Sequence, residues 1–160
     1  MLALTGALGT AAMAASPVSA QHAGAGDEPR TRGRSGIARE RPFVEHRLAL
    51  QLSDRDEDKQ AMILSVTYNM LKAYGPDLID IEVVAFGPGI DLLRAGSVHR
   101  VKVDSLVAQS VRFDVCMNTV ETIERNTGQA VDLNPNAHKV QAGVARILAL
   151  CEDGYVLVRP

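Results

Sequence analysis

The residue best placed for chemistry is Cys116, which ends the short apolar segment Arg112–Cys116 and is followed at once by the helix-forming residues from Met117 onward. This pattern predicts a β-strand that leads directly into an α-helix, and α/β proteins place reactive groups at the carboxyl ends of strands. A thiol beside a helix N-terminus lies at the positive end of the helix dipole, which favours the nucleophilic thiolate. The same position is also typical of a small buried cysteine with a packing role, so both interpretations stay open.

A second candidate is the turn Gly87-Pro88-Gly89, which follows an apolar strand and precedes a predicted helix, where backbone N–H groups can hold an anion. It is not a nucleotide-binding fingerprint, because the chain lacks GxGxxG and GxxxxGK[ST] and Pro88 has no N–H to donate. We expect a tight turn that directs the next helix. It belongs to the same carboxyl edge of the sheet as Cys116, so we expect it to form part of the wall of a shared pocket.

Three histidines could act as a base for the thiol, since nucleophile and base need to be close only in space. They are His46, His99 and His138. None has an i,i+4 or Cys-x-x-Cys partner, so the spacing predicts no metal site. His138 is the preferred candidate because it begins a strand next to that of Cys116, although the start of a strand lies at the opposite edge of the sheet.

Acidic residues gather where the first helix is expected to begin: Asp54, Asp56, Glu57 and Asp58. Paired carboxylates can perform acid–base or metal chemistry. At a helix start they complement the dipole, so we interpret them as capping and solubilising residues that lie near the same pocket.

The second cysteine, Cys151, has helical spacing with three aliphatic residues, Val144, Ile147 and Leu148. This spacing predicts a position in the apolar core. We therefore expect no disulfide between the two cysteines, and Cys116 remains the candidate free thiol.

The first 42 residues differ in composition from the rest. Residues 1–20 are small, apolar and uncharged, with small-x-small cleavage signals that end at Ala14 and Ala20, as in a secretory signal peptide cleaved near Ala20. This segment is too short and too often broken by Thr and Gly to make a stable membrane anchor. Residues 21–42 are rich in Gly, Arg and Pro and predict a flexible, solvated linker, whose Arg-rich part could alternatively touch an anionic surface.

Bulk composition excludes several classes of partner. A net charge of −2 and a pI near 6.1 argue against binding to nucleic acid, and 4% aromatic residues leave few platforms on which bases or sugars could stack. The 160-residue chain, 46% of it hydrophobic, has length for one folded domain over residues 43–160. We expect no cofactor, and a periplasmic or secreted location follows from the predicted signal peptide.

Strand and helix patterns alternate about five times along this domain. The expected strands are His46–Leu52, Ile79–Phe86, Arg112–Cys116, 138–141 and Tyr155–Val158, and the expected helices are 56–74, 90–94, 102–109, 119–126 and 143–152. Alternation of this kind predicts a mostly parallel sheet with helices on both faces. In the first helix we expect an inner face of Met62, Val66, Met70 and Ala73.

Three segments together resemble the DsrE/DsrF-like family: VRFDVCMNT at residues 111–119, EVVAFGPG at residues 82–89, and the ending from Gly143 through Pro160. The resemblance covers the chain from about Arg47 to its end. It implies a flavodoxin-like three-layer α/β sandwich that assembles as a homo-trimer or hexamer. It also implies that a cysteine at the end of the third strand carries sulfur as a persulfide, and Cys116 occupies that place.

Two features depart from the sulfur-relay members of that family. Many relatives have a glycine after the cysteine, where this chain has Met117, whose side chain changes the loop beside the thiol. The sulfur-relay members also act in the cytoplasm, whereas an exported protein would meet donors such as thiosulfate or polysulfide.

The resemblance therefore implies a sulfur carrier or sulfurtransferase-like protein with an exposed Cys116 of lowered pKa. The expected site comprises Cys116, Met117, Asn118, Thr119, Gly87, Pro88 and Gly89, with Asn118 and the following helix N–H groups stabilising the anion. One alternative is a non-catalytic oligomeric module of the periplasm that binds a small ligand or serves in assembly, in which Cys116 can become Ser without loss. Another is a redox-sensing thiol, for which Cys151 is expected to be too buried to act as partner.

Overall fold

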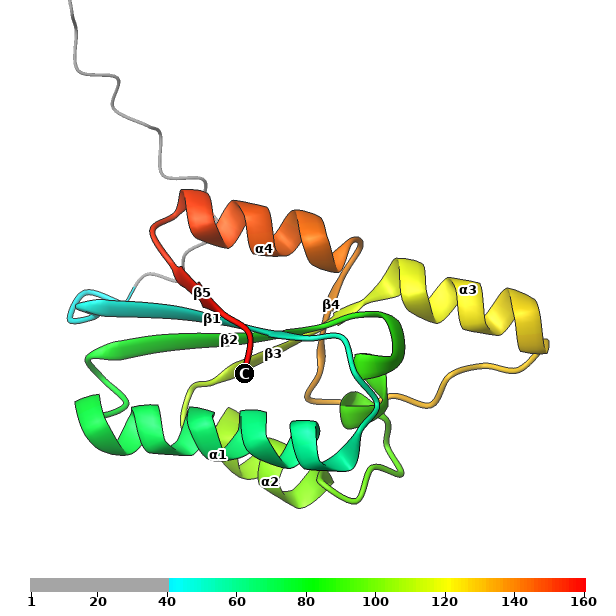
Figure 1. Ribbon diagram of the computed structural model, residues 1–160, viewed down its shortest axis with the longest axis horizontal. Coiled ribbons are helices and arrows are strands. Elements are labelled where there is room, and N and C mark those ends of the chain that lie inside the picture. Colours follow the sequence, from blue (N-terminus) through cyan, green and yellow to red (C-terminus); the bar gives the residue numbers. More distant parts are fainter. Residues whose placement is uncertain (1–40) are drawn as a thin grey trace, which may run out of the picture. The chain divides into compact units, whose positions relative to one another are not determined.

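Five parallel strands form one sheet in the computed structural model, which describes residues 41–160 (Figure 1). Their spatial order is β4-β3-β2-β1-β5. The strands are β1 (His46–Leu52), β2 (Ile79–Ala85), β3 (Arg112–Cys116), β4 (His138–Val140) and β5 (Val156–Val158). The expected signal peptide and all but the last two residues of the expected linker lie outside the described residues.

The strand order explains how the helices divide between the two faces of the sheet. The helices are α1 (Glu57–Tyr74), the 3-10 helix η1 (Gly87–Leu93), α2 (Arg100–Ala108), α3 (Met117–Thr127) and α4 (Gly143–Glu152). From β1 to β3 each strand is added on the same side, so right-handed crossovers bring α1 and α2 to one face. The connection from β4 to β5 runs back across the sheet, and its helix α4 lies on the opposite face (Figure 1). The predicted flavodoxin-like three-layer α/β class is confirmed.

The two faces of the sheet are packed differently. Most of the apolar core lies between the sheet and the α1, α2 and η1 layer, and Phe113 and Leu50 are among its largest fully buried side chains. The α4 side holds a smaller cluster of Ala49, Val84, Ile147, Leu150 and Tyr155. Because strand side chains alternate between faces, buried acids in β2 and β3 also point to the α4 side. These acids are Asp80, Glu82 and Asp114.

The acidic residues before α1 act as expected at the helix start. Asp56 is the N-cap, and its Oδ1 accepts a hydrogen bond from the backbone N–H of Lys59 at 3.0 Å. Asp54 accepts another from Nζ of Lys59 at 3.0 Å. Asp56 thus satisfies one of the unpaired N–H groups of the first turn.

The predicted inner face of α1 is right in part, because Val66 and Met70 pack against the main core whereas Met62 and Ala73 are exposed. Met62, one of its predicted members, is 50% exposed. The buried residues are Gln60, Ile63, Leu64, Thr67 and Leu71. Gln60 and Thr67 bond to backbone carbonyls of Arg55 and Ile63, so two polar residues belong to the buried stripe, and hydrophobic periodicity could not include them.

The prediction that Cys151 lies in the core is also wrong, because its side chain is exposed. Of its expected neighbours Ile147 is buried, whereas Val144 and Leu148 are more than half exposed. The helix α4 carries aliphatic residues on more than one side, so periodicity did not identify the side that meets the sheet. Eight residues of helix, about 12 Å, separate Cys151 from Gly143 beside Cys116, which is too far for a disulfide between the two cysteines.

Within residues 41–160 no helix is both long and apolar enough to cross a bilayer.

Candidate functional site

Cys116 lies between the N-termini of two helices. It is the last residue of β3 and the N-cap of α3. The first residue of α4, Gly143, approaches from the other side, so closely that a Cβ built there would lie 3.3 Å from Cβ of Cys116 and 3.1 Å from Cβ of Phe86. Only glycine allows α4 to begin this near to the thiol. The positive ends of two helix dipoles therefore converge on one sulfur.

This surrounding lowers the pKa of the Cys116 thiol. Burial is the largest single influence and raises the pKa, because it disfavours the charged form. The backbone N–H of Gly143, the hydroxyl of Thr119 and the backbone N–H groups of Thr119 and Asn118 act in the opposite direction and together outweigh burial. The pKa of Cys116 thus lies below that of an ordinary cysteine, which is the direction that the sequence predicted.

The expectation of an exposed thiol is wrong, because Cys116 is only 6% exposed. Gln141, which follows β4, covers the sulfur, and the Cys116 thiol donates to its carbonyl oxygen at 3.8 Å. The same carbonyl accepts from the backbone N–H of Asn118 at 3.0 Å, and the Gln141 side chain donates to Oδ1 of Asn118 at 2.8 Å and to Oε1 of Glu121 at 3.3 Å. The access of a reactant to the sulfur is therefore restricted.

The turn predicted beside the site is the first turn of η1 itself. The backbone N–H of Gly87 donates to Oγ1 of Thr119 at 3.0 Å, which ties η1 to the first turn of α3. Pro88 lies in the first turn of η1. At Gly89 a Cβ would lie 2.3 Å from the carbonyl oxygen of Leu52, so this glycine lets η1 pack onto the end of β1.

The structure therefore brings four of the predicted site residues together and directs the others elsewhere. Cys116, Asn118, Thr119 and Gly87 meet at the carboxyl edge of the sheet, whereas Met117 packs against the main apolar core. Two cavities of about 470 and 490 Å³ lie between α1 and α2 and beside the start of α1, and neither is lined by Cys116.

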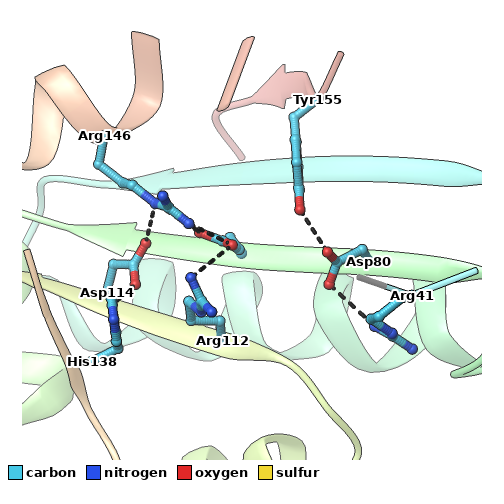
Figure 2. Close-up of polar contacts among 8 residues, drawn as sticks. Arg41, Asp80, Arg112, Asp114, His138, Arg146 and Tyr155 are labelled. Carbon is cyan, nitrogen blue, oxygen red and sulfur yellow. Dashed lines mark hydrogen bonds and ion pairs between the residues drawn. The ribbon is translucent and has the colours of Figure 1, made fainter. Parts of the chain in front are cut away.

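A cluster of buried charges lies under α4 (Figure 2). One of its members, Asp114, lies two residues before Cys116 on β3 and so faces the same side of the sheet. Arg146 of α4 donates from Nη2 to Oε2 of Glu82 at 2.6 Å and from Nε to Oδ2 of Asp114 at 3.1 Å. Both carboxylates are fully buried. Arg112 lies 3.4 Å from Glu82, and Nδ1 of His138 lies 2.8 Å from Oδ1 of Asp114.

These groups shift one another's ionisation. Burial, and then the charge of Asp114, raise the pKa of Glu82 to about 7. Burial also raises the pKa of Asp114, although Glu82 and Arg146 oppose it. Arg146 is itself partly buried, which lowers its pKa, but its two carboxylate partners more than compensate and keep it charged.

Our sequence analysis did not identify this cluster, although a signal was present. Glu82 and Asp80 interrupt the apolar residues of β2, and Asp114 occupies a position of β3 that faces the same side. Arg146 lies in an apolar helix. Charged residues at single positions of apolar elements indicate buried partners, because an unpaired buried charge is too costly to keep.

A second polar contact ties the C-terminal segment to the sheet on the same face (Figure 2). The hydroxyl of Tyr155 donates to Oδ2 of Asp80 at 2.6 Å, and Nη1 of Arg41 donates to Oδ1 at 3.1 Å. Arg41 also bonds to the carbonyl oxygen of Pro76. These bonds hold the start of β5 over β2.

The three candidate bases lie at different places. The ring of His46 contacts that of Tyr74 in a tilted arrangement with centroids 4.3 Å apart, and His99 precedes α2 as its N-cap. His138 forms a hydrogen bond with Asp114 and lies opposite it on the neighbouring strand. Asp114 in turn lies two residues before Cys116. Over residues 41–160 no group of three His, Cys, Asp or Glu residues is arranged to hold a metal ion.

Comparison with known proteins gives a structural relative but no named function. No protein-family model matches the sequence, and no curated protein is significantly similar to it. Among solved structures, the chain is similar to MTH1491 from Methanobacterium thermoautotrophicum, described as a protein of unknown function. The two share 28% sequence identity at a TM-score of 0.66, over 72% of this chain and all of the other.

Proposed function

We propose that this protein is a sulfur carrier or sulfurtransferase-like protein of the DsrE/DsrF type, in which Cys116 holds sulfane sulfur as a persulfide. One observation carries the proposal: the N–H groups at two helix N-termini converge on a cysteine thiol and lower its pKa. A nucleophilic sulfur must be a thiolate at working pH, and a lowered pKa favours that form.

The proposed reaction has two steps. In the first, the Cys116 thiolate attacks the outer sulfur of thiosulfate, the sulfur–sulfur bond breaks, and sulfite leaves with the bonding electron pair. The product is Cys116–S–S⁻. In the second, an acceptor thiolate attacks the outer sulfur of this persulfide, and the Cys116 thiolate leaves. A polysulfide donor reacts in the same way and leaves one sulfur shorter, so neither route needs an external oxidant or reductant.

The proposal includes export and assembly. The segment of residues 1–20 would direct the chain to the periplasm or outside the cell without serving as a stable membrane anchor. A homo-trimer or hexamer is supported by exposed aliphatic side chains on α4 and on the edge strand β5. These are Val144, Leu148, Val156, Leu157 and Val158. Exposed apolar side chains gathered on neighbouring elements are typical of interfaces between protein chains.

The proposal is tested by the mass of the intact protein after incubation with thiosulfate or polysulfide. We expect the wild type and Cys151→Ser to gain sulfur atoms and Cys116→Ser to gain none. Cys151 is the exposed thiol, so it controls for non-specific reaction at an accessible cysteine. Equal uptake by all three proteins, or no uptake by any, would contradict the proposal.

The burial of Cys116 favours one alternative, a non-catalytic module in which the donors around the thiol hold a small anion or the oligomer itself is the working unit. In that case Cys116→Ser keeps the assembly and any ligand binding. Sulfur uptake that depends on Cys116 would exclude this alternative.

A further inference from the structure

The approach of α4 to Cys116 depends on few contacts. Gly143 and Arg146 are one turn apart at the start of α4, and of the remaining residues in the helix only Ile147 and Leu150 are buried. Aliphatic contacts are non-directional, so they hold the helix near the sheet without fixing its rotation or its position along its own axis. The two aliphatic anchors alone therefore leave the direction of the Gly143 N–H poorly determined.

Arg146 supplies the missing directional contact. Its guanidinium donates to carboxylates on two different strands, Glu82 of β2 and Asp114 of β3, and its side chain is only 10% exposed. A planar fork held at two points restricts both the position and the rotation of the helix that carries it. Asp114 lies on the same strand and face as Cys116, so the fork fixes α4 relative to the strand that bears the thiol.

We propose that Arg146 is a positioning residue, which holds the first turn of α4 against Cys116 and keeps the N–H of Gly143 directed at its sulfur. This proposal concerns how the thiol of Cys116 is held. It rests on the proposed function only in taking sulfur transfer as the reaction that this thiol performs. Arg146 acts through α4 rather than by contact with a reactant.

The expected direction follows from the balance at the sulfur. Without the fork, Ile147 and Leu150 still hold α4 over the sheet, so the thiol stays buried while the Gly143 N–H is no longer held towards the sulfur. Burial raises the pKa of Cys116 and this N–H lowers it, so loss of the N–H with burial kept moves the pKa up, towards its ordinary value. The contribution of one helix terminus to a neighbouring charge corresponds to about a two- to fivefold change in thiolate fraction at pH 7.

The experiment follows the rate of iodoacetamide alkylation against pH in full-length protein that carries Cys151→Ser, so that only Cys116 reacts. The midpoint of the profile reports acidity, and the plateau at high pH reports accessibility. We expect Arg146→Gln to raise the midpoint and to lower the thiolate fraction at pH 7 about threefold. Arg146→Lys, which keeps the charge but not the fork, should fall between Arg146→Gln and the wild type.

Two further variants separate positioning from charge. Arg112→Gln removes a positive charge from the same cluster without altering α4, so the midpoint should stay near that of the wild type. Gly143→Ala leaves every charge in place but pushes α4 from Phe86 and Cys116, so the midpoint should rise as in Arg146→Gln. If Arg112→Gln raises the midpoint as much as Arg146→Gln, or if Arg146→Gln leaves it unchanged, the proposal is wrong.

Stability does not prevent this test. Removing Arg146 alone leaves two buried carboxylates short of a partner, so Arg146→Gln is also combined with Glu82→Gln and Asp114→Asn, which leaves no charge on these three residues. The triple variant should fold and keep the raised midpoint. Failure of the wild type to take up sulfur would count against the proposed function only, because the midpoints are measured without any sulfur donor.

Discussion

The charge cluster under α4 makes the stability of the protein depend on pH through Glu82. The folded protein holds this carboxyl at a pKa of about 7, against 4.5 for an ordinary glutamate. Between these two pH values the folded protein retains a proton that the unfolded chain has released. The free energy of unfolding therefore falls as pH rises from 4.5 to about 7 and changes little above that range on this account.

The size of the effect follows from the width of that pH range. At about 1.4 kcal/mol for each pH unit, the range from 4.5 to about 7 corresponds to a loss of about 3 kcal/mol. Glutamine resembles the protonated carboxyl in shape and does not titrate. We therefore predict that Glu82→Gln has a small effect near pH 4.5, and that the variant gains about 3 kcal/mol relative to the wild type by pH 8.

Urea unfolding at several pH values between 4.5 and 8 measures this difference directly. Glu45→Gln, which alters an exposed carboxylate, is the matched control and should run parallel to the wild type. A constant difference between Glu82→Gln and the wild type across the whole range would refute the argument. A variant that loses stability relative to the wild type as the pH rises would also refute it. That result would mean that Arg146 lowers the pKa of Glu82 in the folded protein, instead of burial raising it.

Three further predictions concern other contacts. Tyr155→Phe removes the hydroxyl that bonds to buried Asp80 and should cost about 1–3 kcal/mol in urea unfolding, whereas Tyr68→Phe, at a half-exposed ring, should cost little. Gly89→Ala places a methyl group against the Leu52 carbonyl and should lower the melting temperature, whereas Gly96→Ala, with nothing within 4 Å, should not. Leu148→Glu puts a charge on the exposed face of α4 and should reduce the oligomer to smaller species in sedimentation velocity, and a monomeric wild type would contradict the proposed assembly.

The fold could be predicted from local sequence because each element carries its own signal. The alternation of β-branched runs with longer helical patterns predicts parallel strands, and short loops leave few ways to connect them. Cys116 was found in the same way, since the end of a strand before a helix is a local pattern. Expected and observed elements differ mainly by one to three residues at their ends, where capping and fraying decide the boundary.

The burial of particular side chains could not be predicted in this way. Gln141, 25 residues after Cys116, covers it only because β4 pairs with β3. Arg146 meets Glu82 across 64 residues. Such contacts depend on the register of strands and on which side of α4 meets the sheet, and neither is encoded within a single element. The exposure of Cys151 and the burial of Gln60 and Thr67 in α1 were missed for the same reason.

The most direct test of the account compares the two thiols of one protein. Alkylation rates against pH are measured for Cys116 in Cys151→Ser and for Cys151 in Cys116→Ser, with the full-length chain in both cases. If two helix N-termini hold Cys116 as a thiolate, its midpoint lies clearly below that of Cys151, and its plateau rate is slower because Gln141 covers the sulfur. Equal midpoints, or a higher midpoint for Cys116, would contradict the claim that this site is built to hold an anionic sulfur.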